Sequence, residues 1–167
     1  MPINKYVNPV KLIIMFIKFI NTPLGKMVAK ADDNAVFALD FEEMFSEDLA
    51  EKPNNILLQL ETEVLEYFEG KRETFSIPIL LQGTDFQIKT WQVLQKIPFG
   101  KTISYAEQAT LVGNKKAVRA VAGANSKNGI VLLVPCHRVI GSNGALTGFS
   151  SGIWRKEKLI ELEKNKK

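Results

Sequence analysis

The sequence has very little of the two side chains that most often carry thiol and metal chemistry. Its 167 residues include one cysteine and one histidine, Cys136 and His137. A single cysteine excludes a disulfide within the chain and is typical of a reducing compartment, so we expect a cytoplasmic location. Cysteine and histidine ligands are too few to assemble a zinc site, and the sequence predicts neither a metal nor a cofactor.

The sequence also lacks an apolar run long enough to cross a membrane. The candidate run, residues 10–20, is shorter than the roughly 20 residues that a spanning helix needs. It contains Lys18 and is not followed by a small-residue cleavage site. Its β-branched and aromatic residues favour a buried strand instead. We therefore expect neither a signal peptide nor a transmembrane segment.

Charge of both signs is present, but it is unevenly distributed. Lysine and arginine number 22 against 18 aspartate and glutamate residues, which gives a net charge of +4. Acidic residues crowd residues 32–51, whereas basic residues enrich the chain after residue 100. This asymmetry predicts that the second half of the chain carries a surface for a polyanionic partner.

The first half of the chain predicts a small antiparallel sheet covered by a helix. Strands are expected over residues 10–20, 26–31 and 35–40, with a hairpin turn between the last two. A helix should follow over residues 56–69, capped by Asn54 or Asn55 and ended by Gly70. Beyond an extended edge segment at residues 74–81, we place a boundary between two domains, residues 1–82 and residues 83–167.

The second half predicts short helices separated by turns. We expect helices over residues 85–96, 105–113, 115–125 and 153–163, with a buried strand over residues 130–134 and a hairpin at residues 143 and 144. The expected caps are Asp85 for the first helix, a capping box of Ser104 and Glu107 for the second, Asn114 for the third and a serine for the last. The second and third helices form a helix-turn-helix candidate. Residues 164–167 should be a disordered tail.

The helix predicted over residues 115–125 has an unusual surface. Its small residues are Ala117, Ala120, Ala122, Gly123 and Ala124, and its long ones are Lys115, Lys116 and Arg119. Small side chains let a helix approach another surface closely, such as the DNA minor groove, which is only about 6 Å wide. Tight packing against a second helix inside the protein explains the same pattern, and the residues alone leave both interpretations open.

Cys136 and His137 stand side by side in the stretch from Val134 to Ile140. A thiol becomes a strong nucleophile when a base accepts its proton and nearby positive charge lowers its pKa, and His137 and Arg138 are candidates for these roles. Neighbours on a strand point to opposite faces, so a contact between them needs a turn or a bridging water, and Pro135 favours such a break. A buried, inert cysteine fits the same residues equally well.

The residues from Pro135 to Phe149 resemble the active-site signature of the O6-alkylguanine-DNA alkyltransferases, also called methylated-DNA:protein cysteine methyltransferases. The signature reads Pro-Cys-His-Arg-Val-Ile-Gly-Ser-Asn-Gly from residue 135, followed by Leu-Thr-Gly-Phe from residue 146. The resemblance extends from Phe86 to Glu163, and only in outline to the first half. It implies a ribonuclease-H-like α/β domain followed by a winged-helix-like helix-turn-helix domain. It also implies a monomer that binds the minor groove of double-stranded DNA containing O6-alkylguanine.

The resemblance implies DNA repair by direct damage reversal, in which the alkyl group of the guanine moves irreversibly to Cys136. His137 would accept the thiol proton through a water, Glu163 would orient His137, Tyr105 would donate to the extruded guanine, and Arg119 would fill the gap left in the base stack. The implied DNA-binding residues are Ser104, Lys116, Ala117, Arg119, Ala120 and Gly123. The implied residues around the base are Asn128, Arg138, Val139, Phe149 and Ser150, with Phe149 where many members have tyrosine.

The chemistry of a thiol acceptor predicts one turnover per molecule. The product is a thioether, which has no carbonyl for water to attack, and the chain has no second cysteine to regenerate the thiol. Two other functions compete with repair. A non-repairing sensor of alkylated bases resembles the same family but lacks the cysteine, and a thiol hydrolase has no use for a small-residue helix carrying Arg119.

Overall fold

The computed structural model describes residues 15–166, so the first part of the strand predicted from residue 10 lies outside the described residues. Strands β1 (Phe16–Thr22), β2 (Gly25–Ala31) and β3 (Val36–Phe41) form an antiparallel sheet in that order. A 3-10 turn, η1 (Glu42–Met44), follows β3. The three predicted strands are thus confirmed where the structure describes them.

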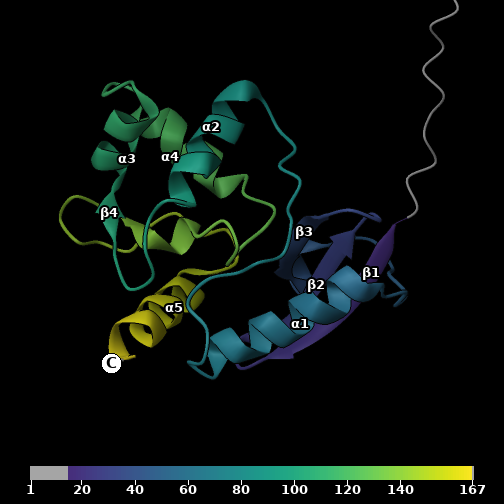
Figure 1. Ribbon diagram of the computed structural model, residues 1–167. Coiled ribbons are helices and arrows are strands. Elements are labelled where there is room, and N and C mark those ends of the chain that lie inside the picture. Colours follow the sequence, from purple (N-terminus) through teal and green to yellow (C-terminus); the bar gives the residue numbers. More distant parts are fainter. Residues whose placement is uncertain (1–14, 167) are drawn as a thin grey trace, which may run out of the picture.

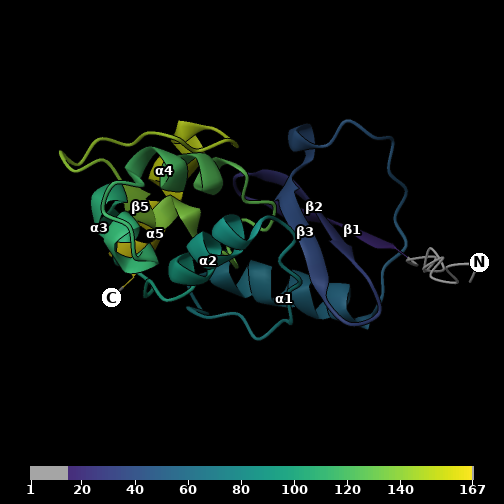
Figure 2. The ribbon, with the colours of Figure 1, turned by 90° about the horizontal axis from the view of Figure 1, so that it is seen from above.

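Helix α1 (Asn55–Phe68) lies along one face of this sheet (Figures 1 and 2). The side chain of Asn54 accepts a hydrogen bond from the backbone N–H of Leu57, which satisfies one of the free donors at the helix start. Its buried face repeats every three to four residues and consists of Leu57, Leu60, Glu63, Val64 and Tyr67. Fully burying an aliphatic side chain contributes about 1.5–3 kcal/mol, so this face fixes the helix on the sheet.

The second half is mainly helical. Its elements are α2 (Asp85–Leu94), β4 (Ile103–Ser104), α3 (Tyr105–Val112), α4 (Val118–Ser126), the 3-10 turn η2 (Cys136–Arg138), β5 (Val139–Ile140) and α5 (Ile153–Asn165). Helices α2, α3 and α4 pack on one another (Figure 1). Gln108 and Asn125 exchange two buried hydrogen bonds of 2.9 and 2.7 Å, which lock α3 against α4. This is the predicted helix-turn-helix arrangement.

One hydrophobic core runs through both halves. Ile20 of β1, Tyr67 of α1, Leu94 of α2 and Leu159 of α5 are all fully buried in the same cluster. The boundary predicted at residues 82 and 83 falls in the segment between α1 and α2 and stays a prediction. Within residues 15–166, no helix is long and apolar enough to cross a membrane.

Two of the predicted helix caps are confirmed and three are wrong. Asn54 caps α1, and Ser104 forms the predicted capping box with Glu107. At α2 the capping box belongs to Thr84 and Gln87, so the cap lies one residue before Asp85. The other two errors are at α4 and α5. Helix α4 begins at Val118 because Asn114 accepts a hydrogen bond from the Lys116 N–H in a turn, and α5 has Gly152 rather than a serine at its cap.

Two further predictions about local structure are wrong. Residues 130–134 do not form a strand: Ile130 makes an isolated bridge to Leu39, and Leu132 then adopts a left-handed backbone with φ of 72°. Local bonds from Leu133 to Val131 and from Val134 to Ile130 close a turn instead, so an apolar run here reflects burial rather than strand pairing. The tail expected to begin at residue 164 is helical as far as Asn165.

Candidate active site

Cys136 begins the 3-10 turn η2, in which Pro135 is the preceding residue. The turn supplies the break in the backbone that the sequence predicts. The thiol is buried, with an exposed fraction of 7%, and its sulfur lies 3.2 Å from the side-chain nitrogen of Asn128. The same nitrogen donates to the Val134 carbonyl at 2.7 Å, so Asn128 holds both the loop and the sulfur.

His137 points to the end of α5. Its Nε2 lies 2.7 Å from Oε1 of Glu163, and the imidazole is 1% exposed. The other ring nitrogen, Nδ1, is buried and has no hydrogen-bond partner among the described residues. The ring is therefore oriented by Glu163 through one nitrogen, which leaves the other available to exchange a proton.

Glu163 accepts five hydrogen bonds in a buried cluster. Oε1 accepts three of them, at 2.7–2.9 Å, from Tyr67 Oη, His137 Nε2 and Arg138 Nη2. Oε2 accepts the other two, from Arg138 Nε at 3.0 Å and from the Gly100 N–H at 3.1 Å. Arg138 also donates to the Ile97 carbonyl at 2.7 Å. The sequence leads us to consider Arg138 for the thiol or the base pocket, but the structure places its guanidinium on Glu163.

Together, burial, hydrogen bonds and charge raise the pKa of the Cys136 thiol and lower those of His137 and Glu163. Burial raises the pKa of the Cys136 thiol to about 11, against smaller lowering effects of the Asn128 hydrogen bond and the Lys156 charge. Burial also lowers the pKa of His137, so the imidazole is neutral at pH 7 and can accept a proton. Burial alone would raise the pKa of Glu163, but the hydrogen bonds from His137 and Arg138 and the charge of Arg138 lower it far below its usual range.

Lys156 is a residue of the candidate site that sequence reasoning missed. It lies on α5, is fully buried, and donates to the Thr147 carbonyl at 2.7 Å and to Tyr105 Oη at 3.4 Å. Burial lowers its pKa to about 8, while the nearby Cys136 raises it. The available signal was spacing: Lys156 precedes Glu163 by seven residues, which is two helical turns, so both lie on one face of α5.

The loop after Cys136 closes over Tyr105. Tyr105 Oη donates to the Thr147 carbonyl at 2.8 Å, and a Cβ on Gly148 would lie 2.9 Å from the same Oη, which only glycine permits. Phe149 is buried in the core, whereas Ser150 is exposed and donates from Oγ to the Ser126 carbonyl at 2.8 Å. Of the residues predicted around the base, Val139 is buried in β5, where it pairs with Ile103.

The outer face of α4 is small and basic. Arg119, Ala120, Gly123 and the preceding Lys116 are exposed, and a Cβ on Gly123 would meet nothing within 4 Å. Ala117 is half-buried at the start of the helix. The opposite face packs inward through Val121 and Ala124, whose carbonyl accepts a hydrogen bond from Trp91. Internal helix packing therefore does not use Ala120 or Gly123, and these residues remain free for an external surface.

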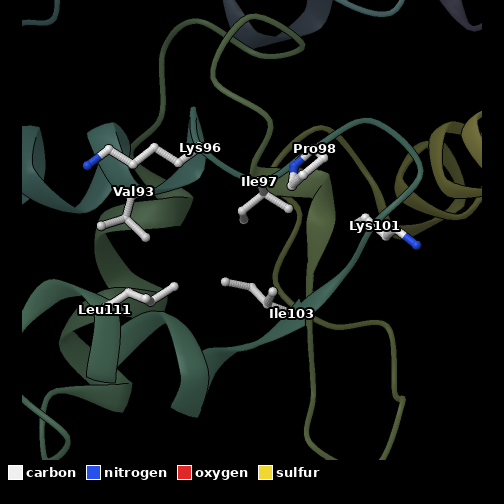
Figure 3. Close-up of a pocket in the computed structure, with 7 residues that line it drawn as sticks. All are labelled: Val93, Lys96, Ile97, Pro98, Lys101, Ile103 and Leu111. Carbon is white, nitrogen blue, oxygen red and sulfur yellow. The ribbon is translucent and has the colours of Figure 1, made fainter.

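A separate cavity of about 350 Å³ lies between α2, α3 and β4. Figure 3 shows Val93, Ile97, Ile103 and Leu111 converging on it, with the Lys96 and Lys101 side chains at its edge. None of the predicted site residues lines this cavity. It borders the Cys136 region through Ile97, whose carbonyl accepts from Arg138, and through Ile103, which pairs with Val139. We assign the chemistry to the Cys136 region because it combines a thiol with a histidine whose ring is oriented by a carboxylate.

Family models and known relatives match almost all of the described chain. The 6-O-methylguanine DNA methyltransferase ribonuclease-like domain matches residues 15–81, and the DNA binding domain of the same description matches residues 85–165. The constitutive methylated-DNA–protein-cysteine methyltransferase of Bacillus subtilis is 43% identical over 138 residues, covering 77% of this chain and 82% of that protein. These matches confirm the family resemblance that the Cys136 signature indicates.

Solved structures agree with this assignment. The crystal structure of the Mycobacterium tuberculosis O6-methylguanine methyltransferase is 36% identical and has a TM-score of 0.85, covering 92% of this chain and 95% of that one. The Mycobacterium tuberculosis OGT in complex with DNA is 37% identical and has a TM-score of 0.83, covering 90% and 94%. The expected fold, a ribonuclease-like sheet domain followed by a helical DNA-binding domain, is confirmed. The chain belongs to the 6-O-methylguanine DNA methyltransferase family.

Proposed function

We propose that this protein repairs DNA by transferring the alkyl group of O6-alkylguanine irreversibly to Cys136. The observation that carries the proposal is that the single thiol of the chain is buried beside Asn128, in the turn that also carries His137, whose ring is held by Glu163. The charge of Lys156 lowers the pKa of this thiol. This arrangement can generate a thiolate in a site that is shielded from bulk solvent. Family membership supports the proposal, since the relatives are named methylated-DNA–protein-cysteine methyltransferases.

The proposed reaction is a displacement at carbon. His137 Nδ1 accepts the thiol proton through a bridging water, and the imidazolium is stabilised by the Glu163 carboxylate. The sulfur then bonds to the alkyl carbon as the bond from that carbon to O6 breaks, and its electrons pass to the guanine ring. The guanine anion takes up a proton, and Cys136 keeps the alkyl group as a thioether. No electron donor or acceptor is needed, and the thiol is consumed.

Tyr105 and Lys156 supply positive charge and a proton where the guanine leaves. Tyr105 Oη hydrogen-bonds to Thr147 and Lys156, so the Thr147 carbonyl can keep Lys156 as its donor while Tyr105 turns to the base. A donor aimed at the developing negative charge of the leaving group accelerates its departure. Asn128 supports the loop, Arg138 fixes Glu163, and Phe149 and Ser150 border the base in this proposal.

The exposed face of α4 is the proposed DNA surface. Ala120 and Gly123 allow the helix to approach the minor groove, Arg119 occupies the place of the extruded guanine, and Ala117, Lys116 and Ser104 contact the backbone. The phosphate contacts predict an affinity for undamaged DNA that falls with salt. We also propose that the protein acts as a monomer in the cytoplasm, where a reducing environment keeps Cys136 a free thiol.

Intact mass measurement tests the proposal directly. Stoichiometric protein mixed with a duplex containing O6-methylguanine should gain one methyl group per molecule, and peptide mapping should place it on Cys136. Excess DNA should produce no second addition, because the thioether is not hydrolysed. Tight binding to the damaged duplex without any mass change would favour the sensor function over repair.

The role of Arg119 gives a second prediction. Replacing Arg119 by alanine should slow repair of duplex DNA by roughly 10- to 100-fold, since loss of a side chain that fills the stack disfavours base extrusion by a few kcal/mol. Reaction with free O6-methylguanine base should be unchanged because a free base needs no extrusion. Single-turnover rates on both substrates provide the measurement, and equal losses would remove the role in extrusion.

Lys156 gives a prediction in which activity and stability change in opposite directions. Lys156→Met should reduce the transfer rate by roughly 10- to 100-fold because a charge that favours both thiolate and leaving group is lost. The folded protein should become more stable at pH 7, since burial penalises the ammonium and lowers the pKa of Lys156 to about 8 from 10.5.

The lowered pKa of Lys156 determines the pH range in which this residue changes the stability of the folded protein. Between about pH 8 and 10.5 the unfolded chain binds a proton at Lys156 that the folded chain does not, so this group makes stability rise with pH there. The methionine variant should lack that rise. Urea unfolding at several pH values and single-turnover rates are the measurements, and a variant that is both less stable and fully active would contradict the assignment.

A further inference from the structure

Strand β3 of the N-terminal sheet contacts the chain on both sides of Cys136. On the side before the cysteine, the Leu39 N–H donates to the Gly129 carbonyl at 2.8 Å, and the Val131 N–H donates to the Leu39 carbonyl at 2.9 Å. On the side after it, Ser151 Oγ donates to Asp40 Oδ1 at 2.6 Å. Two adjacent residues of one strand therefore hold both segments that frame the thiol.

Asp40 is an unusual residue for a buried contact between the two halves of the molecule. Its exposed fraction is 7% and that of Ser151 is 5%, so a carboxyl group is buried between the two halves of the molecule. Oδ1 also accepts the Phe41 N–H at 2.8 Å. Burial of a carboxylate is costly unless hydrogen bonds compensate, and an apolar contact would join the halves at lower cost. The geometry thus indicates a role beyond cohesion.

The turn that Asp40 holds belongs to the site. Residues 147–152 are fixed at three further points: Thr147 by Tyr105 and Lys156, Ser150 by the Ser126 carbonyl, and the Ser151 carbonyl by Arg155. Phe149 and Ser150, which border the base in the proposed function, lie immediately before Ser151. Loss of the Asp40 contact releases the Ser151 side chain, so that, of these side-chain anchors, only the bond from Arg155 to the Ser151 carbonyl still holds the end of this turn.

The charged groups around Asp40 are few and identifiable. The guanidinium of Arg155 lies on the same side and is itself paired with Glu43 and stacked on Phe41. Burial raises the pKa of Asp40, whereas Ser151, the Phe41 N–H and Arg155 lower it and Glu43 raises it. The negative charge of Asp40 in turn raises the pKa of Cys136, which Asn128 and Lys156 lower.

We propose that Asp40 is a positioning residue for alkyl transfer, which holds the turn at residues 149–152 in place beside Cys136 through Ser151. The inference rests on the proposed function and adds to it a contribution from the N-terminal sheet. It predicts that the Asp40–Ser151 contact acts as a unit, so that removing either partner has the same effect as removing both.

The test uses the full chain with Asp40→Ala, Ser151→Ala, the double variant, and Asp40→Asn, which keeps an acceptor oxygen. Single-turnover rates at saturating O6-methylguanine duplex should fall roughly 10- to 100-fold for either alanine variant, because small displacements of positioning groups have effects of this size. The double variant should lose no more than the singles. Asp40→Asn should retain the wild-type rate at pH 7 or exceed it. The increase of its rate with pH should begin at a lower pH than in the wild type, because the charge that raises the pKa of Cys136 is gone.

Glu47→Gln is the matched control, and two different outcomes would contradict the inference or the proposed function. Glu47→Gln changes an exposed carboxylate of the same half, paired with Lys30, and should leave rate and pH profile unchanged. If the variants unfold at lower urea concentration but react at the wild-type rate with the same pH profile, Asp40 is only structural and the inference is overturned. If the wild-type protein itself gains no methyl group, the proposed function fails instead.

Discussion

Replacing Cys136 by serine should abolish alkyl transfer completely while leaving binding of the damaged duplex intact. A serine hydroxyl is far less acidic than a thiol, so transfer of its proton to His137 produces too little alkoxide to attack the alkyl carbon. The variant should fold normally, since a serine oxygen can accept the hydrogen bond that Asn128 gives to the sulfur. The change in free energy of unfolding should stay within about 1 kcal/mol.

Two measurements check this result on the same samples. Intact mass should show no methyl addition to the serine variant after long incubation with O6-methylguanine duplex, and fluorescence anisotropy should give a dissociation constant within a few-fold of wild type. Because the variant binds without reacting, it should also shield the lesion from repair by added wild-type protein. Methyl addition to the serine variant would mean that Cys136 is not the acceptor.

The parts of the fold that the sequence predicted well are those determined by local chemistry. Asn54 and the Ser104–Glu107 pair satisfy free backbone donors wherever a helix starts, so their spacing alone locates α1 and α3. The β-branched and aromatic content of residues 10–20 and the hairpin turn before residue 35 located the strands of the sheet in the same way. The resemblance around Cys136 also indicated the family, because ten consecutive residues with distinct roles seldom coincide by chance.

The parts that could not be predicted depend on contacts distant in sequence. Residues 130–134 look like a strand, but β3 provides a pairing position only at Leu39, so the segment turns back on itself. Arg138 lies only two residues after Cys136, yet its guanidinium pairs with the carboxylate of Glu163. The Lys156 ammonium and the Asp40 carboxylate approach the site from α5 and from the N-terminal sheet, and no pattern near Cys136 points to either.

Substitution of Glu163 by glutamine should have the largest effect on stability of any single change in the site. The amide removes the charge that pairs with buried Arg138 and presents a donor where two donors now converge. Breaking a buried ion pair by removing one partner costs about 3–5 kcal/mol. The exposed neighbour Glu161, which pairs with Lys158 on the same helix, provides the control, and Glu161→Gln should cost less than about 0.5 kcal/mol.

The pH dependence of this effect follows from the sign of the pKa shift. Because the folded pKa of Glu163 lies far below its ordinary 4.5, its contribution to stability is fully present above about pH 4.5 and is lost as the pH falls further. Urea unfolding of the wild-type protein should therefore show an acid decline below that pH. Glu163→Gln should flatten it, since the amide does not titrate.

Activity separates the role of Glu163 in orientation from its role in folding. In the double variant Glu163→Gln with Arg138→Met, no unpaired charge remains buried, so part of the lost stability should return. Transfer should nevertheless stay slower than wild type by on the order of 10²-fold, because His137 has lost the carboxylate that orients the ring and stabilises the imidazolium. If the double variant recovers both stability and rate, Glu163 acts only through Arg138 and the assignment of His137 as an oriented base is wrong.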